Sequence, residues 1–257
     1  MEKDYFYINE KGQKVGTYRL AGFNVEISSA YKRIHAMCYD YRTDGEPEIR
    51  IETTADEIER ERDSFVKEIG EDQPETKNHY IETLLVYRKL SLCLLDHGIL
   101  LMHGSCLAVD GEGVLFTALS GTGKSTHTRM WREMLGDRVV MVNDDKPLIR
   151  VNTPNSPQIY GTPWNGKHNL STNIAVPLKA IVYLERGEEN EIHEIDAKEI
   201  FPVLVQQTFR TEDVDVTMKV LDLLSQLASK LKFYDLHCNL DPEAAKVAYS
   251  GIFPAED

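Results

Sequence analysis

The side chains with the clearest capacity for chemistry lie in residues 113–135, GVLFTALSGTGKSTHTRMWREML. An apolar run over 114–118 indicates a buried strand, a loop containing two glycines follows, and the pattern from Lys124 to residue 135 is helical. The unpaired amide groups at the start of a helix, together with its dipole, attract anions. Strand, loop, Lys-Ser-Thr and helix in this order therefore predict a phosphate-binding loop.

Residues of this loop have distinct expected roles in binding a nucleoside triphosphate. Lys124 is expected to reach the β- and γ-phosphate oxygens, and the hydroxyl of Ser125 is expected to ligate Mg²⁺. Gly121 and Gly123 allow backbone angles that other residues disfavour, so the loop can close around a phosphate. Ala118 replaces the first glycine of the usual motif, and because alanine is small we expect a subclass of the motif. A Gly-rich turn without a ligand is the alternative.

A pair of carboxylates follows the next expected strand, residues 138–142 (RVVMV), in the sequence Asn143-Asp144-Asp145-Lys146. Adjacent carboxylates at a strand end downstream of a phosphate-binding loop are typical of Mg²⁺ ligation and proton abstraction in phosphoryl transfer. One carboxylate can hold the metal while the other takes a hydroxyl proton. Aspartates that only cap a turn or a helix are the alternative.

Two further segments contain residues that could contact the substrate or the transferred phosphate. Residues 152–177 are rich in turn formers and include Trp164, Lys167 and His168, which predicts either a lid that contacts the substrate or a purely structural loop. Arg210 could reach the transferred phosphate, or it could be a surface arginine at a helix end.

The composition excludes several classes of partner. A net charge of -13 argues against binding to nucleic acid or to an anionic membrane surface. The four cysteines form no CxxC pair, which favours reduced thiols in a cytoplasmic protein. The N-terminus has no apolar signal core, and charged residues interrupt the most apolar region, 84–102, so we expect no membrane span.

The expected elements form an α/β protein with a mixed sheet flanked by helices. Residues 1–75 are predicted to form a strand-rich N-terminal region, with weak strands near 34–41 and 49–51, followed by a charged helix that begins at a Thr54/Glu57 capping box. Residues 76–257 are predicted to form the catalytic domain, beginning with a helix over 77–97. A hairpin over 105–116 with an Asp110-Gly111 turn leads into the phosphate-binding loop. The remaining predictions are strands at 99–102, 179–185, 191–195 and 232–237 and helices at 197–208, 214–231 and after Asp241-Pro242.

The run HGSCLAVDGEGVLFTALSGTGKST resembles the core of the superfamily of HPr kinase/phosphorylase and ATP-dependent phosphoenolpyruvate carboxykinase. Three features of that superfamily occur here in order: His103-Gly104, the loop at 120–126, and Asp144-Asp145. The segments YGTPWNGKH, VPLKAIVYLER and QQTFR resemble a bacterial subgroup of HPr-kinase-like proteins. The resemblance covers roughly residues 84–250 and implies the P-loop kinase fold of this superfamily.

The resemblance also implies residue roles. Mg²⁺ would be held by Ser125 and Asp145, and Asp144 would act as the base toward an acceptor hydroxyl. His103 would sit beside the aspartates and tune their proton affinity, while Arg210 and Lys167 would stabilise charge near the γ-phosphate. The residues implied to bind ATP are Ser120, Gly121, Thr122, Gly123, Lys124, Ser125 and Thr126.

The main hypothesis is therefore an ATP-dependent, Mg²⁺-requiring kinase that acts on a hydroxyl of a small molecule or a peptide. The alternatives are an ATP-binding regulatory protein without turnover and a serine kinase for lasso-type peptides. The chain lacks the RGxGxxxxR-like run of HPr kinases proper, which argues against HPr as the substrate. By analogy with HPr kinases, a homo-oligomer is a further expectation.

Overall fold

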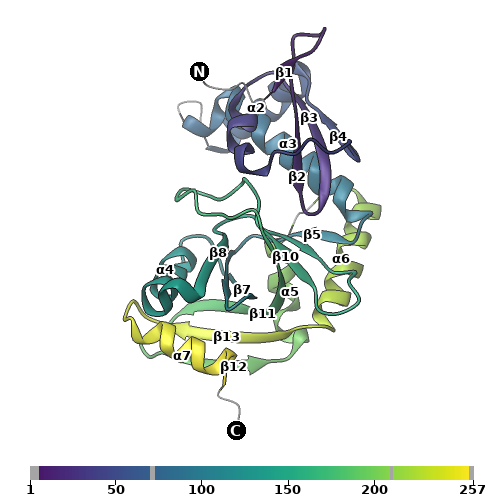
Figure 1. Ribbon diagram of the computed structural model, residues 1–257. Coiled ribbons are helices and arrows are strands. Elements are labelled where there is room, and N and C mark those ends of the chain that lie inside the picture. The colour runs from purple at the N-terminus through teal and green to yellow at the C-terminus, as the bar shows by residue number, and fades with distance from the viewer. Residues whose placement is uncertain (1–5, 70–72, 209–210, 255–257) are drawn as a thin grey trace. The chain divides into compact units, whose positions relative to one another are not determined.

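The computed structural model of the protein describes residues 6–69, 73–208 and 211–254 (Figure 1). The chain divides into two compact units, one up to Leu94 and one from Leu95 onward. Both combine strands and helices, so the expected mixed α/β class with a strand-rich N-terminal region is confirmed at this level.

The first unit contains a four-stranded sheet in the order β1-β2-β3-β4, in which only the β3–β4 pair is parallel. Its strands alternate between buried and more exposed residues, as expected for a sheet with one face on a core. The elements are β1 (Tyr7–Ile8), β2 (Lys14–Leu20), β3 (Phe23–Ser29), α1 (Arg33–Met37), η1 (Tyr39–Tyr41), β4 (Ile49–Glu52), α2 (Ala55–Ile69), η2 (Pro74–Thr76) and α3 (Asn78–Leu95).

The expected strand near 34–41 is wrong, because this stretch forms α1 and the 3-10 turn η1. The helix buries His35, whose Nδ1 lies 2.6 Å from the Tyr18 hydroxyl and whose Nε2 lies 2.8 Å from the Ser29 hydroxyl. These partners come from β2 and β3, so tertiary hydrogen bonds override a weak local preference for strand.

The boundary between the two units also differs from the expected one at residue 75, because α3 belongs with the first unit. Glu82 of α3 is buried and accepts hydrogen bonds from the amides of Ala30 and Tyr31 at 2.6 and 2.9 Å, and from the Thr53 hydroxyl at 2.7 Å. Ile81 and Leu85 of the same helix pack against Ile58 of α2. The helix therefore completes the N-terminal core.

The second unit contains a large mixed sheet in the order β5-β9-β10-β11-β7-β6-β8, with β13 on β11 and β12 on β13. Three strands, β7, β11 and β13, run parallel, so their carboxyl ends share one edge. The strands are β5 (Ile99–Leu101), β6 (Ser105–Val109), β7 (Glu112–Thr117), β8 (Val139–Asn143), β9 (Leu148–Arg150), β10 (Gln158–Tyr160), β11 (Ala175–Arg186), β12 (Glu191–Ile195) and β13 (Lys232–Cys238).

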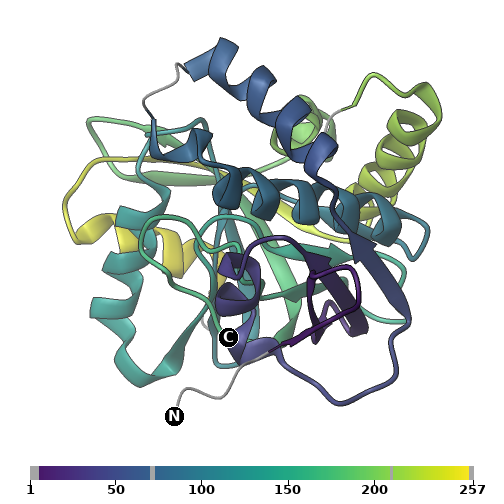
Figure 2. The same cartoon turned by 90° about the horizontal axis from the view of Figure 1, so that it is seen from above.

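Helices of the second unit lie on opposite sides of it, with α4 beside α7 and α5 beside α6 (Figures 1 and 2). Trp131 of α4 is fully buried against Phe116 of β7 and against Tyr249 and Phe253, which lie in α7 and directly after it. The helices are α4 (Lys124–Leu135), η3 (Gly136–Arg138), α5 (Ala197–Gln207), α6 (Val214–Ala228) and α7 (Glu243–Ile252).

The expected hairpin before the phosphate-binding loop is confirmed: β6 and β7 pair antiparallel, and Asp110 and Gly111 form their turn with φ of 50° and 89°. The expected capping box is also present, with Thr54 and Glu57 bonded to each other's backbone. Among the described residues no helix is long and apolar enough to cross a membrane.

Candidate functional site

The loop that is predicted to bind phosphate connects the carboxyl end of β7 to the start of α4, so the predicted order of strand, loop and helix is present. Gly121 and Gly123 adopt φ of 77° and 127°, a region that side chains disfavour, so both glycines are required by the backbone. Gly123 caps α4 without any side-chain hydrogen bond. The amide groups of the first turn of α4 are therefore available to an anion.

Arg186, which the sequence did not single out, holds this loop from the side. Thr117 of β7 pairs with Tyr183 of β11, so Arg186 at the end of β11 lies level with the loop. Its Nη2 donates to the carbonyl of Gly121 at 2.6 Å, and its Nε donates to that of Thr122 at 3.4 Å. The guanidinium group of Arg186 therefore lies on the carbonyl side of the loop and does not contact the amide groups at the start of α4 through these two bonds.

Lys124 lies folded over its own loop, where its Nζ donates to the carbonyls of Ala118 and Leu119 at 3.1 and 3.4 Å. Burial lowers the pKa of Lys124, and the carboxylates of Asp145 and Asp144 act in the opposite direction. The lysine of the loop and the two aspartates of the next strand end are thus close enough to interact electrostatically.

Asp144 is buried and is held by a chain of hydroxyl groups. Its Oδ1 accepts a hydrogen bond of 2.6 Å from Ser105, whose hydroxyl lies 3.0 Å from that of Thr128. Because Ser105 donates its only proton to Asp144, Thr128 of α4 donates to the Ser105 oxygen, and the carbonyl of Ser125 at 3.3 Å is a second, longer acceptor for the Thr128 proton. This chain connects the carboxylate to the helix of the phosphate-binding loop, and Ser105 was not among the residues expected from the sequence.

His103 lies beside the aspartates, as the resemblance implied. Its Nε2 is 3.4 Å from Oδ1 of Asp145, whose Oδ2 is 2.5 Å from Nζ of Lys146. Nδ1 of His103 donates at 2.8 Å to Oε1 of Gln207, because a carbonyl oxygen only accepts. Burial lowers the pKa of His103, and the hydrogen bond to Gln207 opposes this. Because Nδ1 faces Gln207, the ring presents Nε2 to Asp145.

Asn143 fixes the turn that carries the aspartates, another role that the sequence did not reveal. Its Oδ1 accepts from the amides of Asp145 and Lys146 at 2.8 and 2.6 Å. Its Nδ2 donates to the carbonyls of Thr162 and Trp164 at 2.9 and 3.3 Å. One fully buried amide therefore holds both the strand end and the loop at 161–171.

The three residues expected to contact a substrate differ in their exposure to solvent. Trp164 is buried, with 4% of its surface exposed, whereas Lys167 and His168 are exposed on a turn. Gly166, directly before them, approaches Asp145 so closely that an added Cβ would lie 3.1 Å from the Cβ of that residue. The turn therefore borders Asp145, and Arg210 lies outside the described residues.

The donors around the loop fit a nucleotide phosphate and a hard cation. The amide groups of α4 and the ammonium group of Lys124 are anion donors, and the hydroxyl of Ser125 and the carboxylates of Asp144 and Asp145 are oxygen ligands of the kind that Mg²⁺ prefers. Ser125 and Thr126 are half-buried on the first turn, and Ser120 is exposed on the loop.

Comparison with known proteins assigns this chain to a protein family. The model of the SynChlorMet cassette protein ScmC matches residues 72–241, which is more than half of the chain. The chain belongs to the ScmC family. The residues matched to the ScmC family include the loop at 118–123, both aspartates and Arg186. Among solved structures, the Hpr(Ser) kinase/phosphatase from Coxiella burnetii is similar at 12% identity and a TM-score of 0.26, over 49% of this chain and 88% of that one. No curated protein matches the sequence.

Proposed function

We propose that this protein is an ATP-dependent, Mg²⁺-requiring kinase that transfers the γ-phosphate to a hydroxyl group of a small molecule or a peptide. The observation that carries the proposal is the hydrogen-bonded connection from buried Asp144 through Ser105 to Thr128 of α4, the helix of the predicted phosphate-binding loop, with Asp145 directly beside Asp144. A loop that only bound a nucleotide would need no second carboxylate beside its lysine.

The proposed roles follow from the contacts of each residue. The amides of α4 and the ammonium group of Lys124 bind the phosphates, and Lys124 exchanges its two carbonyl partners for phosphate oxygens. Ser125 and Asp145 would hold Mg²⁺, which supplies positive charge against the phosphates when it is bound. Asp144 accepts the proton of the acceptor hydroxyl as that oxygen bonds to the γ-phosphorus, and ADP leaves as the bond to its bridging oxygen breaks.

The residues around the two aspartates support these roles by orienting the side chains. Ser105 donates to one oxygen of Asp144, which holds the carboxylate in one orientation. His103 lies beside Asp145 and is itself oriented by Gln207. The exposed turn with Lys167 and His168 borders Asp145 and is the proposed contact for the acceptor.

A transfer assay with labelled ATP tests the proposal. Purified wild type is screened against hydroxyl-bearing small molecules and against peptides, beginning with peptides encoded beside the gene, because the family is described as a cassette protein. We expect Asp144→Asn to reduce transfer by about 10² to 10⁴-fold, the usual contribution of a general base, while ATP binding persists. Lys124→Ala should abolish ATP binding as well.

Two further variants sharpen the assay. Asp145→Asn should raise the Mg²⁺ concentration required for transfer, whereas Asp110→Asn removes an exposed aspartate that pairs with Arg138 and should leave transfer unchanged. Transfer by Asp144→Asn at the wild-type rate would refute the assignment of the base. ATP binding by a wild type that phosphorylates no acceptor in the screen would favour the regulatory alternative.

A further inference from the structure

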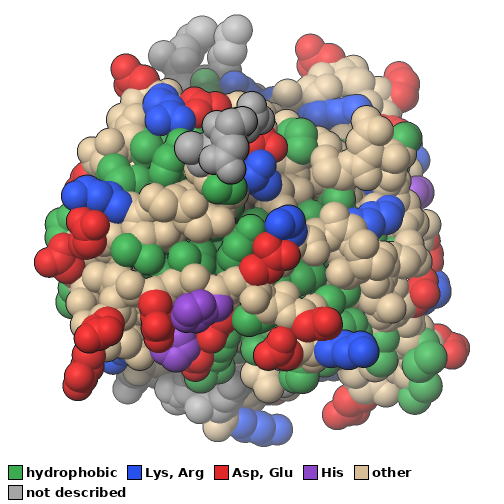
Figure 3. Space-filling model, turned by 90° about the horizontal axis from the view of Figure 1, so that it is seen from below, with side chains coloured by type: hydrophobic (Ala, Val, Ile, Leu, Met, Phe, Trp, Pro, Cys, Tyr) green, Lys and Arg blue, Asp and Glu red, His purple; other side chains and the backbone are tan. Residues whose placement is uncertain are grey.

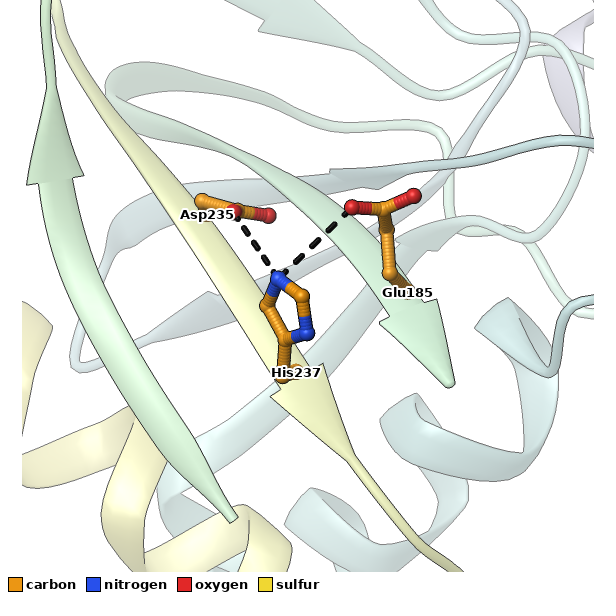
Figure 4. Close-up of side chains that lie close together, drawn as sticks. All are labelled: Glu185, Asp235 and His237. Carbon is orange, nitrogen blue, oxygen red and sulfur yellow. Dashed lines mark hydrogen bonds and ion pairs between the residues drawn. The ribbon is translucent and has the colours of Figure 1, made fainter. Parts of the chain in front are cut away.

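Three side chains outside the proposed phosphoryl-transfer site converge on one point at the carboxyl ends of β11 and β13. Nε2 of His237 lies 3.1 Å from Oδ2 of Asp235 and 3.6 Å from Oε2 of Glu185. Figure 4 shows the imidazole directed between the two carboxylates, with Asp235 and His237 on one strand and Glu185 on its neighbour. One donor atom from each side chain lies within 4.8 Å of the other two.

The sheet register places these side chains together. Asp235 and His237 are two residues apart on β13 and therefore share a face, and Glu185 is the direct partner of His237 on the parallel strand β11. This face lies opposite the one that packs on α4 and α7, because the intervening Leu236 and Leu184 belong to that core. On the surface seen in Figure 3, histidine side chains likewise lie among acidic ones.

The distances match those of a metal site. Zinc–nitrogen and zinc–oxygen bonds of about 2.1 Å place two ligands of a tetrahedral ion about 3.4 Å apart. The two distances from His237 lie on either side of this value. The two carboxylates would need only a small rotation to complete the triangle, since all three donor atoms already lie within 4.8 Å.

A second observation points to a missing ligand. Oδ1 of Asp235 is buried and has no hydrogen-bond partner among the described residues, which is unfavourable for a carboxylate oxygen. Arg186, the neighbour of Glu185 on β11, directs its guanidinium to the carbonyls of Gly121 and Thr122.

We propose that Glu185, Asp235 and His237 bind one divalent transition-metal ion, of which Zn²⁺ is the reference case. Two carboxylates and a neutral imidazole balance the charge of such an ion, and the nitrogen ligand favours transition metals over Mg²⁺. Three protein ligands leave at least one coordination position open. Glu185 and His237 line a cavity of about 410 Å³ that they share with Leu119, Ser120, Gly121 and Thr122, so the ion has access to that space.

Metal binding to the untagged, metal-stripped full-length protein tests this site without nucleotide or acceptor. Zn²⁺ is titrated against a chromophoric chelator, and Co²⁺ is titrated while its visible absorption is recorded. The background is Cys93→Ser, because Cys93 is exposed and thiols bind Zn²⁺. We expect one Zn²⁺ per chain, no displacement by excess Mg²⁺, and an intensified Co²⁺ spectrum typical of low coordination number.

Variants distinguish this site from general surface binding. His237→Ala and Asp235→Asn should each weaken Zn²⁺ binding about tenfold or more, a loss typical of disturbed metal ligation. His193→Ala is the matched control, because His193 forms a similar exposed pair with Glu191 on the adjacent strand β12 at 3.4 Å. Lys124→Ala should bind Zn²⁺ like wild type, which separates this site from the proposed kinase function.

Two results would overturn the proposal: no stoichiometric Zn²⁺ binding by the parent protein, or an equal loss in His193→Ala and His237→Ala. Thermal unfolding with and without Zn²⁺ keeps the test valid for variants of altered stability. The ion should raise the unfolding temperature of the parent protein, because it binds only the folded state tightly, and should not raise that of Asp235→Asn.

Discussion

A buried histidine behind the phosphate-binding loop gives a quantitative prediction for stability against pH. His127 of α4 is 1% exposed, and its Nε2 accepts a hydrogen bond of 3.0 Å from Nε1 of Trp131. The edge of Phe116 and the thiol of Cys238 also pack on the ring. Burial lowers the pKa of His127 from 6.5 to about 4, because the charged ring would lose its hydration and displace the tryptophan donor.

Proton linkage gives the direction and the size of the change in stability with pH. Between pH 6.5 and about 4 the unfolded chain binds a proton at His127 that the folded chain does not, so stability falls as the pH falls. At about 1.36 kcal/mol per pH unit, the full interval corresponds to about 3.4 kcal/mol. The contribution is fully present above pH 6.5 and is lost progressively down to about pH 4. His35 in the first unit has the same depressed pKa and gives a parallel loss there.

Urea unfolding of wild type and His127→Gln at several pH values between 4 and 7 measures this effect. Glutamine keeps an acceptor for Trp131 but does not titrate in this range. Tryptophan fluorescence reports on the second unit, because both tryptophans, Trp131 and Trp164, lie in it. The wild type should lose about 2.7 kcal/mol more than the variant over two pH units below 6.5. A difference between the two proteins that stays constant with pH would refute the reasoning.

Three further predictions concern positions that the tertiary structure revealed. Arg186→Ala removes the support of the phosphate-binding loop and should weaken ATP binding about two- to tenfold by calorimetry, equivalent to one hydrogen bond; unchanged affinity would contradict this. Asn143→Ala leaves buried carbonyls and amides without partners and should lower the free energy of unfolding by about 2–4 kcal/mol. Asn143→Asp should cost at least as much, because it buries a charge and points an oxygen at the carbonyls of Thr162 and Trp164. Glu82→Ala removes three hydrogen bonds from the first unit and should lower its free energy of unfolding by about 2–4 kcal/mol, measured by circular dichroism. Glu82→Gln should be tolerated better than Glu82→Ala, because burial raises the pKa of Glu82 and so already disfavours its charged form.

Local features of this chain were predictable because the sequence encodes them at short range. The hairpin at 105–117, its Asp110-Gly111 turn, the glycine-dependent loop and the first helical turn at Lys124 each depend on neighbours within a few residues. The stretch at 33–41 was not predictable in this way. Its helix is stabilised by hydrogen bonds of His35 to Tyr18 and Ser29, which lie on strands earlier in the chain.

The arrangement of the functional groups depends on sheet order, which short-range patterns do not encode. Ser105 meets Asp144 across 39 residues because β6 and β8 pair side by side, and His103 meets Gln207 across 104 residues because the end of α5 lies beside the chain that follows β5. Nothing in the spacing of Asp144 and Asp145 shows which carboxylate faces a serine and which a histidine.

By itself, then, the sequence predicted a glycine-containing loop between a buried strand and a helix, with a carboxylate pair downstream. The tertiary structure decided what surrounds that loop, because β11 lies between β7 and β13. That one placement brings Arg186 to the loop and joins Glu185 with Asp235 and His237. Contacts between β11 and its two neighbours form only when the parallel strands align, since Glu185 meets His237, and Arg186 meets the loop after β7, only across the sheet.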